Sequence, residues 1–138
     1  NDRKTILIKI DDDNKKLINC AIRRIDIENN GELKTLKYSL SCPDVHIWGL
    51  DEVLKGDKIW LTEGILDTIA ISRFLEKSVS VSSPHWSAIQ LLQLVEKSPS
   101  KVDIFSDNDK IGIINSFIIK EVLNLYDIKC DVFISDCA

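Results

Sequence analysis

Acidic residues follow two apolar segments of the sequence in a pattern that suits metal-dependent chemistry. Glu63 comes directly after KIWLT and is followed by glycine, while Asp107 and Asp109 come directly after KVDIFS. Taken singly, each acid is better explained as a helix cap, because free backbone amides and the helix dipole favour carboxylates at a helix N-terminus. If the three acids converge, however, they repel one another unless a cation compensates their charge. Oxygen ligands suit Mg²⁺ or Mn²⁺, so we predict that Glu63, Asp107 and Asp109 form a metal site.

Convergence depends on the elements that carry these acids. From residue 57 onward, short apolar runs typical of strands, at 57–63, 79–82, 101–106 and 129–134, alternate with helical spacing at 64–77, 83–97 and 110–126. This alternation predicts an α/β domain with a four-stranded parallel sheet. In such sheets, ligands bind at the carboxyl ends of the strands, where Glu63, Asp107 and Asp109 are placed.

Two details of these helices can be compared with a structure. We expect the helix over 83–97 to begin with Ser83 as its N-cap and Pro84 at its first position. In the helix over 110–126 we expect the following residues to face inward: Ile114, Phe117, Ile118, Val122 and Leu125.

The first part of the chain has a different pattern. Strands are expected at 5–10, 17–27 and 33–40, and the links between them are rich in Asp, Asn and Gly, as hairpin turns require. This predicts a small antiparallel β meander. We therefore divide the chain into a β-rich subdomain with its linker at 1–50 and an α/β domain at 57–138.

The composition is that of an ordinary globular protein. The chain has 138 residues, 44% of them hydrophobic, and a net charge of −4, which is compatible with an acidic metal site beside local basic patches. Its four cysteines form no CxxC pair, so we expect reduced thiols in a cytoplasmic protein. We expect no membrane association, because no apolar run approaches the length of a membrane span. Because the chain starts at Asn1 and lacks methionine, we expect a fragment of a longer protein.

Several other sites are excluded by spacing. A calcium-binding EF-hand starting at Asp107 would have Ile118 where a bidentate Glu is required. The sequence contains no P-loop, no dinucleotide-binding glycine motif and no GxSxG nucleophile elbow. We interpret His46 and His85 as structural, since they lie in connecting segments without an evident catalytic triad.

The two acidic segments resemble a known pair of motifs. TEGILDTIA (62–70) and IFSDNDKIG (104–112) are similar to the Glu-Gly…Asp and Asp-x-Asp-x-x-Gly motifs of the Toprim domain, which primases, topoisomerases, small nucleases and recombination proteins share. The resemblance covers 57–138. Upstream, IRRIDIENNGELKTLKYSL followed by IWGLDEVL resembles bacterial and phage primase catalytic cores. It implies a Toprim-like four-stranded parallel sheet with flanking helices, preceded by the small antiparallel β meander.

The resemblance also implies an activity. It implies a DNA primase fragment, a nucleotidyltransferase that makes RNA primers from NTPs on a single-stranded DNA template during replication. A replicative helicase, or a helicase domain in the same polypeptide, is the implied partner, and the compact form suggests a phage or mobile element. The alternatives are a Toprim nuclease that cleaves phosphodiesters and a non-catalytic nucleic-acid-binding module.

The resemblance assigns roles to individual residues. Asp107 and Asp109 would be magnesium or manganese ligands, and Glu63 would be a further ligand or the general base for a ribose hydroxyl. The residues expected to contact nucleotide or nucleic-acid phosphates are Arg23, Arg24, Lys37 and Lys110. The sequence departs from the primase pattern in the loop 82–90, and the family's last acidic cluster is not visible before residue 138.

Overall fold

The computed structural model describes residues 5–11, 17–24, 35–39, 47–74, 77–81 and 85–136. The chain divides into two compact units, residues 1–46 and residues 47–138. Ile47 and Val53 are buried in the core of the second unit, so the segment that leads into its first strand belongs to that unit.

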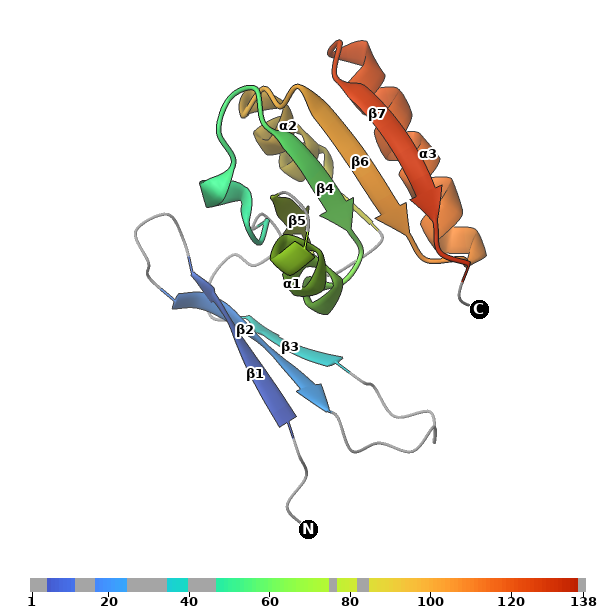
Figure 1. The fold of residues 1–138 in the computed structure, drawn as a ribbon. Coiled ribbons are helices and arrows are strands. Elements are labelled where there is room, and N and C mark those ends of the chain that lie inside the picture. The colour runs from blue at the N-terminus through green and yellow to red at the C-terminus, as the bar shows by residue number, and fades with distance from the viewer. Residues whose placement is uncertain are drawn as a thin grey trace. The chain divides into compact units, whose positions relative to one another are not determined.

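The first unit contains a three-stranded antiparallel sheet (Figure 1). Its strands are β1 (Thr5–Asp11), β2 (Leu17–Arg24) and β3 (Thr35–Ser39), in that order across the sheet. Ala21, at the centre of β2, pairs with Ile8 on one side and Lys37 on the other. The predicted antiparallel meander is therefore confirmed.

The second unit contains a four-stranded parallel sheet with three α-helices. After the short 3-10 helix Leu50–Glu52, strands and helices alternate along the chain in the order β4 (Lys58–Thr62), α1 (Ile65–Phe74), β5 (Ser78–Ser80), α2 (Ala88–Glu96), β6 (Lys101–Ser106), α3 (Lys110–Leu125) and β7 (Lys129–Ile134). The strand order is β5-β4-β6-β7, and all neighbouring strands are parallel. The predicted α/β fold with a four-stranded parallel sheet and flanking helices is confirmed.

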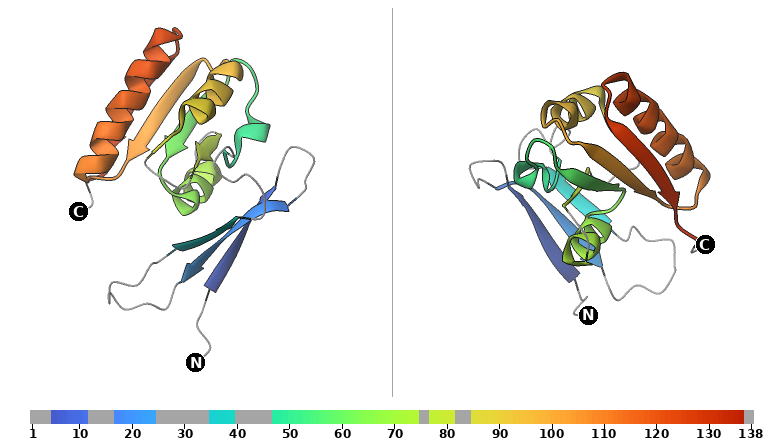
Figure 2. Two further views of the ribbon diagram at one scale, coloured as in Figure 1. Left: turned by 180° about the vertical axis from the view of Figure 1, so that it is seen from behind. Right: turned by 45° about the horizontal axis from the view of Figure 1, so that its top comes forward.

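The core of this unit lies between the sheet and two of its helices. Alternate residues of the central strands, among them Leu61 and Ile104, are buried together with Leu94 of α2 and Leu123 of α3. Helix α1 lies on the opposite face, where the Ser78 hydroxyl of β5 donates to the main-chain oxygen of Thr68 at 2.8 Å. Figures 1 and 2 show α2 and α3 on one side of the sheet and α1 on the other.

Helix α2 begins later than predicted. Ser87 is its N-cap: the Ser87 hydroxyl accepts from Gln90 N at 3.2 Å, and the Gln90 side chain accepts from Ser87 N at 2.9 Å. This reciprocal pair is a capping box, which satisfies amides at the helix start and fixes its first residue at Ala88. The predicted start at Ser83 and Pro84 is wrong, and those two residues lie outside the described part of the chain.

Helix α3 presents a different face to the sheet than predicted. Of the five residues expected to face inward, Val122 packs against the core, whereas Ile114, Phe117, Ile118 and Leu125 are exposed. The buried positions are Gly112, Ser116, Ile119 and Leu123, which follow one another at helical spacing. Small residues at the first two positions let the start of the helix approach the sheet closely. Although α3 has several exposed apolar residues, no helix in the described ranges is long and apolar enough to cross a membrane.

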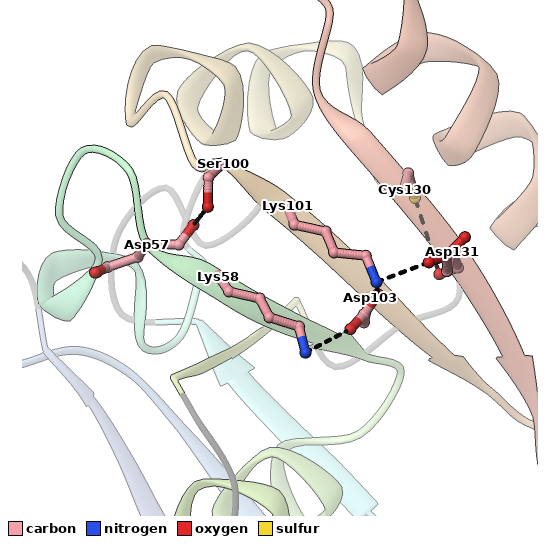
Figure 3. A network of polar contacts seen from close by, with 7 residues as sticks. All are labelled: Asp57, Lys58, Ser100, Lys101, Asp103, Cys130 and Asp131. Carbon is pink, nitrogen blue, oxygen red and sulfur yellow. Dashed lines mark hydrogen bonds and ion pairs between the residues drawn. The ribbon is translucent and has the colours of Figure 1, made fainter.

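A network of charged residues crosses the sheet face opposite α2 and α3 (Figure 3). Asp103, in the middle of β6, is only 1% exposed. Lys58 Nζ lies 3.2 Å from one oxygen of Asp103, and Lys101 Nζ lies 2.8 Å from the other. Lys101 also lies 2.7 Å from Asp131 on β7, and this pairing lowers the Asp131 pKa. The network therefore joins three neighbouring strands and surrounds the buried carboxylate of Asp103 with positive charge.

Candidate carboxylate site at the strand ends

The parallel sheet brings two of the acidic segments together. β4 and β6 are direct neighbours, and Thr62 at the end of β4 pairs with Phe105 near the end of β6. Because parallel strands end at the same edge, the residue after β4 lies beside those that end and follow β6. The register of these two neighbouring strands therefore places Glu63 next to Ser106 and Asp107.

The Glu63 carboxylate is bound at this edge by two hydrogen bonds. Its Oε1 accepts from the Ser106 hydroxyl at 3.1 Å and from Asp107 N at 3.0 Å. Both donors come from the end of β6, forty-three and forty-four positions further along the chain. The side chain of one strand end is thereby tied to the backbone of the next.

Gly112, in the first turn of α3, provides the space for this carboxylate. A Cβ atom at position 112 would overlap Glu63 Oε1, and would lie 3.0 Å from the Ser106 hydroxyl and 3.2 Å from the main-chain oxygen of Asp107. No positive φ is involved, since Gly112 is helical. The glycine of the Asp-x-Asp-x-x-Gly motif is therefore explained by close approach of a carboxylate to the helix.

The two aspartates of the motif have different surroundings. Asp109 is the N-cap of α3, and its Oδ1 accepts from Gly112 N at 2.7 Å. Asp107 lies exposed between β6 and α3, and its main-chain amide, not its carboxylate, makes the bond to Glu63. The helix-cap explanation thus holds for Asp109 and leaves the Asp107 carboxylate without a capping role.

The pKa of Glu63 reflects its surroundings at this edge of the sheet. Burial raises the pKa of Glu63 above its ordinary value, and the hydrogen bonds from Asp107 N and Ser106 partly oppose this rise. The nearby negative charges of Asp107 and Asp109 raise the Glu63 pKa further. Glu63 therefore lies close enough to both aspartates to be affected by their charge, and the joint binding of a metal ion by the three acids stays a prediction.

Their donor chemistry fits a hydrated divalent cation. Magnesium typically binds through one or two carboxylates and keeps several waters, so it needs no preformed protein cage. Within residues 47–74, 77–81 and 85–136, no group of three or more His, Cys, Asp or Glu residues is arranged so that it could hold a metal ion. Glu63 and Asp109 each have one carboxylate oxygen bound by a backbone amide and carry a second oxygen.

The predicted phosphate-binding residues are distributed over both units. Lys110 is the first residue of α3 and is exposed beside the Asp109 cap. Arg23 and Arg24 end β2, and Lys37 lies in the middle of β3, so all three belong to the first unit. Their contribution to the site stays a prediction.

Sequence reasoning missed Ser106. It is the last residue of β6, fully buried, and its hydroxyl lies 3.1 Å from both Glu63 Oε1 and the main-chain oxygen of Asp107. The available signal was a hydroxyl residue immediately before the first aspartate, at a strand end that the apolar pattern had already identified.

Solved structures with the same fold are catalytic cores of DNA primases. The E. coli primase catalytic core matches with a TM-score of 0.74 at 17% identity, over 97% of this chain and 45% of that chain. The Aquifex aeolicus primase, with its zinc-binding and RNA polymerase domains, matches with a TM-score of 0.74 at 19% identity, over 95% of this chain and 34% of that chain. A DnaG primase catalytic domain bound to single-stranded DNA matches with a TM-score of 0.73 at 16% identity, over 95% of this chain and 44% of that chain. No protein-family model and no curated protein matches the sequence.

These similarities confirm the predicted α/β fold, which is shared with primase catalytic cores. The chain spans less than half the length of each of these structures. Residues 47–138 make up about two thirds of the chain. A match over 95% or more must therefore include the first unit as well as the parallel sheet.

Proposed function

We propose that this chain is part of a DNA primase that synthesises RNA primers on a DNA template by metal-dependent phosphoryl transfer. The observation that carries the proposal is the convergence of Glu63, Asp107 and Asp109 at the ends of adjacent strands, in the fold of primase catalytic cores. A fold by itself does not give a function, whereas three acids gathered at the ligand-binding edge of its sheet are a candidate site.

The first unit favours a primase over a Toprim nuclease. A nuclease would use the same carboxylates and requires only the parallel-sheet unit. In this chain the similarity to primase catalytic cores extends into residues 1–46. That unit also contains the basic residues expected to contact phosphates: Arg23, Arg24 and Lys37.

Each acid has a distinct role in this proposal. Bound Mg²⁺ or Mn²⁺ would neutralise the charge of the triphosphate and lower the pKa of the attacking hydroxyl. Asp107 presents an exposed carboxylate to the ion, and Asp109 contributes the oxygen that does not cap α3. Glu63 is a further ligand or, with its raised pKa, the group that accepts the proton of a ribose hydroxyl.

Nucleotide and template would be held by basic side chains. Lys110, the first residue of α3, would contact a nucleotide phosphate, while Arg23, Arg24 and Lys37 would make sequence-independent contacts to the template backbone. The proposed partners are NTPs, single-stranded DNA and a replicative helicase or a helicase domain of the same polypeptide. One structure of the same fold was solved with single-stranded DNA.

Titration with Mg²⁺ and Mn²⁺, followed by thermal unfolding, tests the metal site. A ligand that binds only the folded state stabilises it by about 2.7 kcal/mol at one hundred times its dissociation constant. We expect saturable stabilisation of the wild type, a much weaker response of Asp107→Asn and Glu63→Gln, and an unchanged response of Glu121→Gln. Glu121 is a suitable control because it is an exposed acid in the last half of α3. An unresponsive wild type would contradict the proposal.

Incubation with NTPs, Mg²⁺ and labelled single-stranded DNA separates the two enzymatic alternatives. A primase produces short ribonucleotide chains whose composition follows the template, and a nuclease shortens the DNA whether or not NTPs are present. We expect ribonucleotide synthesis that requires Asp107. Cleavage of the DNA without ribonucleotide synthesis would favour the nuclease.

A further inference from the structure

The Ser106 hydroxyl lies where β4, β6 and α3 meet. It is 3.1 Å from Glu63 Oε1, which follows β4, and 3.1 Å from the main-chain oxygen of Asp107, which leads into α3. A Cβ on Gly112 would lie 3.0 Å from it. The serine side chain therefore contacts the surroundings of both metal-binding segments, although it is not itself one of the acids.

The backbone of Ser106 is fixed on both sides. It pairs with Ile134 of β7, and its main-chain oxygen accepts from Ser135 N at 3.0 Å. On the other side of β6, Phe105 pairs with Thr62 of β4. With the backbone fixed, the position of the hydroxyl oxygen depends only on χ1, which takes one of three staggered values, while the hydroxyl hydrogen can turn to either acceptor.

The hydroxyl has one proton and two acceptors at equal distance. One acceptor is a main-chain carbonyl and the other is a carboxylate, and hydrogen bonds to ionised acceptors are roughly twice as strong as neutral ones. The proton is therefore directed mainly to Glu63. If the serine served only to complete the end of the strand, the carbonyl of Asp107 alone would satisfy it.

We infer that Ser106 is a positioning residue for Glu63. It holds one carboxylate oxygen at the strand end, so that Glu63 stays beside Asp107 and Asp109 when a divalent cation binds. This inference rests on the metal site of the proposed function. Hydrogen-bond partners of ligating carboxylates matter in metal sites generally, where their removal weakens metal binding by about 10- to 100-fold.

The test is calorimetric titration of Mg²⁺ and Mn²⁺ into the wild type, Ser106→Ala and Ser106→Thr. We expect Ser106→Ala to weaken binding by about tenfold or more and Ser106→Thr, which keeps the hydroxyl, to restore most of the affinity. Ser100→Ala is the matched control, because Ser100 lies just before the opposite end of β6 and also donates to a main-chain oxygen, that of Asp57 at 3.2 Å (Figure 3). We expect the control to bind like the wild type.

A second measurement needs no metal. The amide proton of Asp107 bonds to the same oxygen of Glu63, so its NMR chemical shift reports where that carboxylate lies. We expect this shift to move in Ser106→Ala and to return toward the wild-type value in Ser106→Thr. Circular dichroism of each variant confirms that it is folded, and Ser106→Cys replaces Ser106→Ala if the alanine variant unfolds.

The outcomes separate the inference from the proposed function. A wild type that binds Mg²⁺, together with a folded Ser106→Ala that binds equally well and leaves the Asp107 amide unmoved, would overturn the role of Ser106 alone. A wild type that binds no divalent cation would overturn both.

Discussion

Replacing Gly112 with alanine should have two opposing effects on the free energy of unfolding: a gain from helix propensity and a loss from displacement of the Glu63 carboxylate. In an ordinary helix, alanine in place of glycine is favourable by about 1 kcal/mol. Here the new methyl group would overlap Glu63 Oε1, so the carboxylate must move and leave the Ser106 hydroxyl and Asp107 N. Hydrogen bonds to a charged group contribute roughly 1.5–3 kcal/mol each, and less where water reaches them. Because Glu63 is half-buried, we expect a net loss of about 1–2 kcal/mol.

The effect of Gly112→Ala on stability should have the opposite sign when the Glu63 carboxylate is absent. In a Glu63→Ala background the methyl group meets no carboxylate, so Gly112→Ala should stabilise the protein by about 0.5–1 kcal/mol through helix propensity. The double-mutant cycle therefore predicts a coupling of about 2 kcal/mol between the two positions. Urea denaturation followed by circular dichroism measures all four proteins. Asn124→Ala, at an exposed position in the last turn of α3, is a control for a gain in helix propensity without any contact to Glu63.

An equal loss in both backgrounds would refute this reasoning. It would mean that the main-chain oxygen of Asp107, 3.2 Å from the new methyl group, sets the cost. With Glu63 present, the alanine variant should also bind Mg²⁺ more weakly, because the displaced carboxylate no longer lies beside the aspartates.

Three further predictions concern single carboxylates. Asp109→Ala should lower the stability by about 1 kcal/mol, because it removes the helix cap. Asp109→Asn should keep the cap and stay within about 0.5 kcal/mol of the wild type, yet bind Mg²⁺ more weakly. Denaturation and calorimetry on both variants test these results. Because burial raises the Glu63 pKa above 4.5, the folded state binds this proton more tightly than the unfolded state. Without metal, the free energy of unfolding should therefore fall as pH rises from about 4.5 through the raised pKa, and Glu63→Gln should remove this component. Asp103→Asn should cost about 1–3 kcal/mol in urea denaturation, less than a fully buried pair would, because its two lysine partners reach solvent; a loss below 0.5 kcal/mol would contradict the stabilising role of the network.

The sheet and its order of elements could be predicted because the pattern had two clear periods. Apolar runs of strand length alternate with helical spacing, and a parallel sheet follows from that alternation. The position of the acids after two of these runs also predicted that Glu63 lies near the end of β6, where Asp107 N donates a hydrogen bond to its carboxylate.

The buried face of α3 could not be predicted from hydrophobicity. The segment KIGIINSFIIKEVLNL carries apolar residues around most of the helix, so several faces are equally plausible. The structure buries Gly112 and Ser116 and leaves Ile114 and Phe117 exposed. The buried face also brings Gly112 against the carboxylate of Glu63, and such a contact with a residue forty-nine positions earlier is not visible in the helical pattern.

The start of α2 and the role of Ser106 were missed for different reasons. Ser87 and Gln90 have the spacing of a capping box, so the signal was present, but Ser83 followed by Pro84 is an equally good helix start. For Ser106, the sequence identifies a hydroxyl at a strand end and cannot show that a carboxylate from another strand lies 3.1 Å away.

Because the Gly112 amide donates to the carboxylate of Asp109, the hydrogen-exchange rate of this amide reports on the position of that carboxylate. That amide can exchange with deuterium from solvent only when its 2.7 Å bond to Asp109 Oδ1 opens, so its exchange rate counts how often the carboxylate leaves the helix end. An ion that binds Asp109 through the other oxygen would leave this bond closed and slow the exchange. An ion that takes Oδ1 itself would free the amide and speed the exchange, which distinguishes the two modes of binding without a crystal.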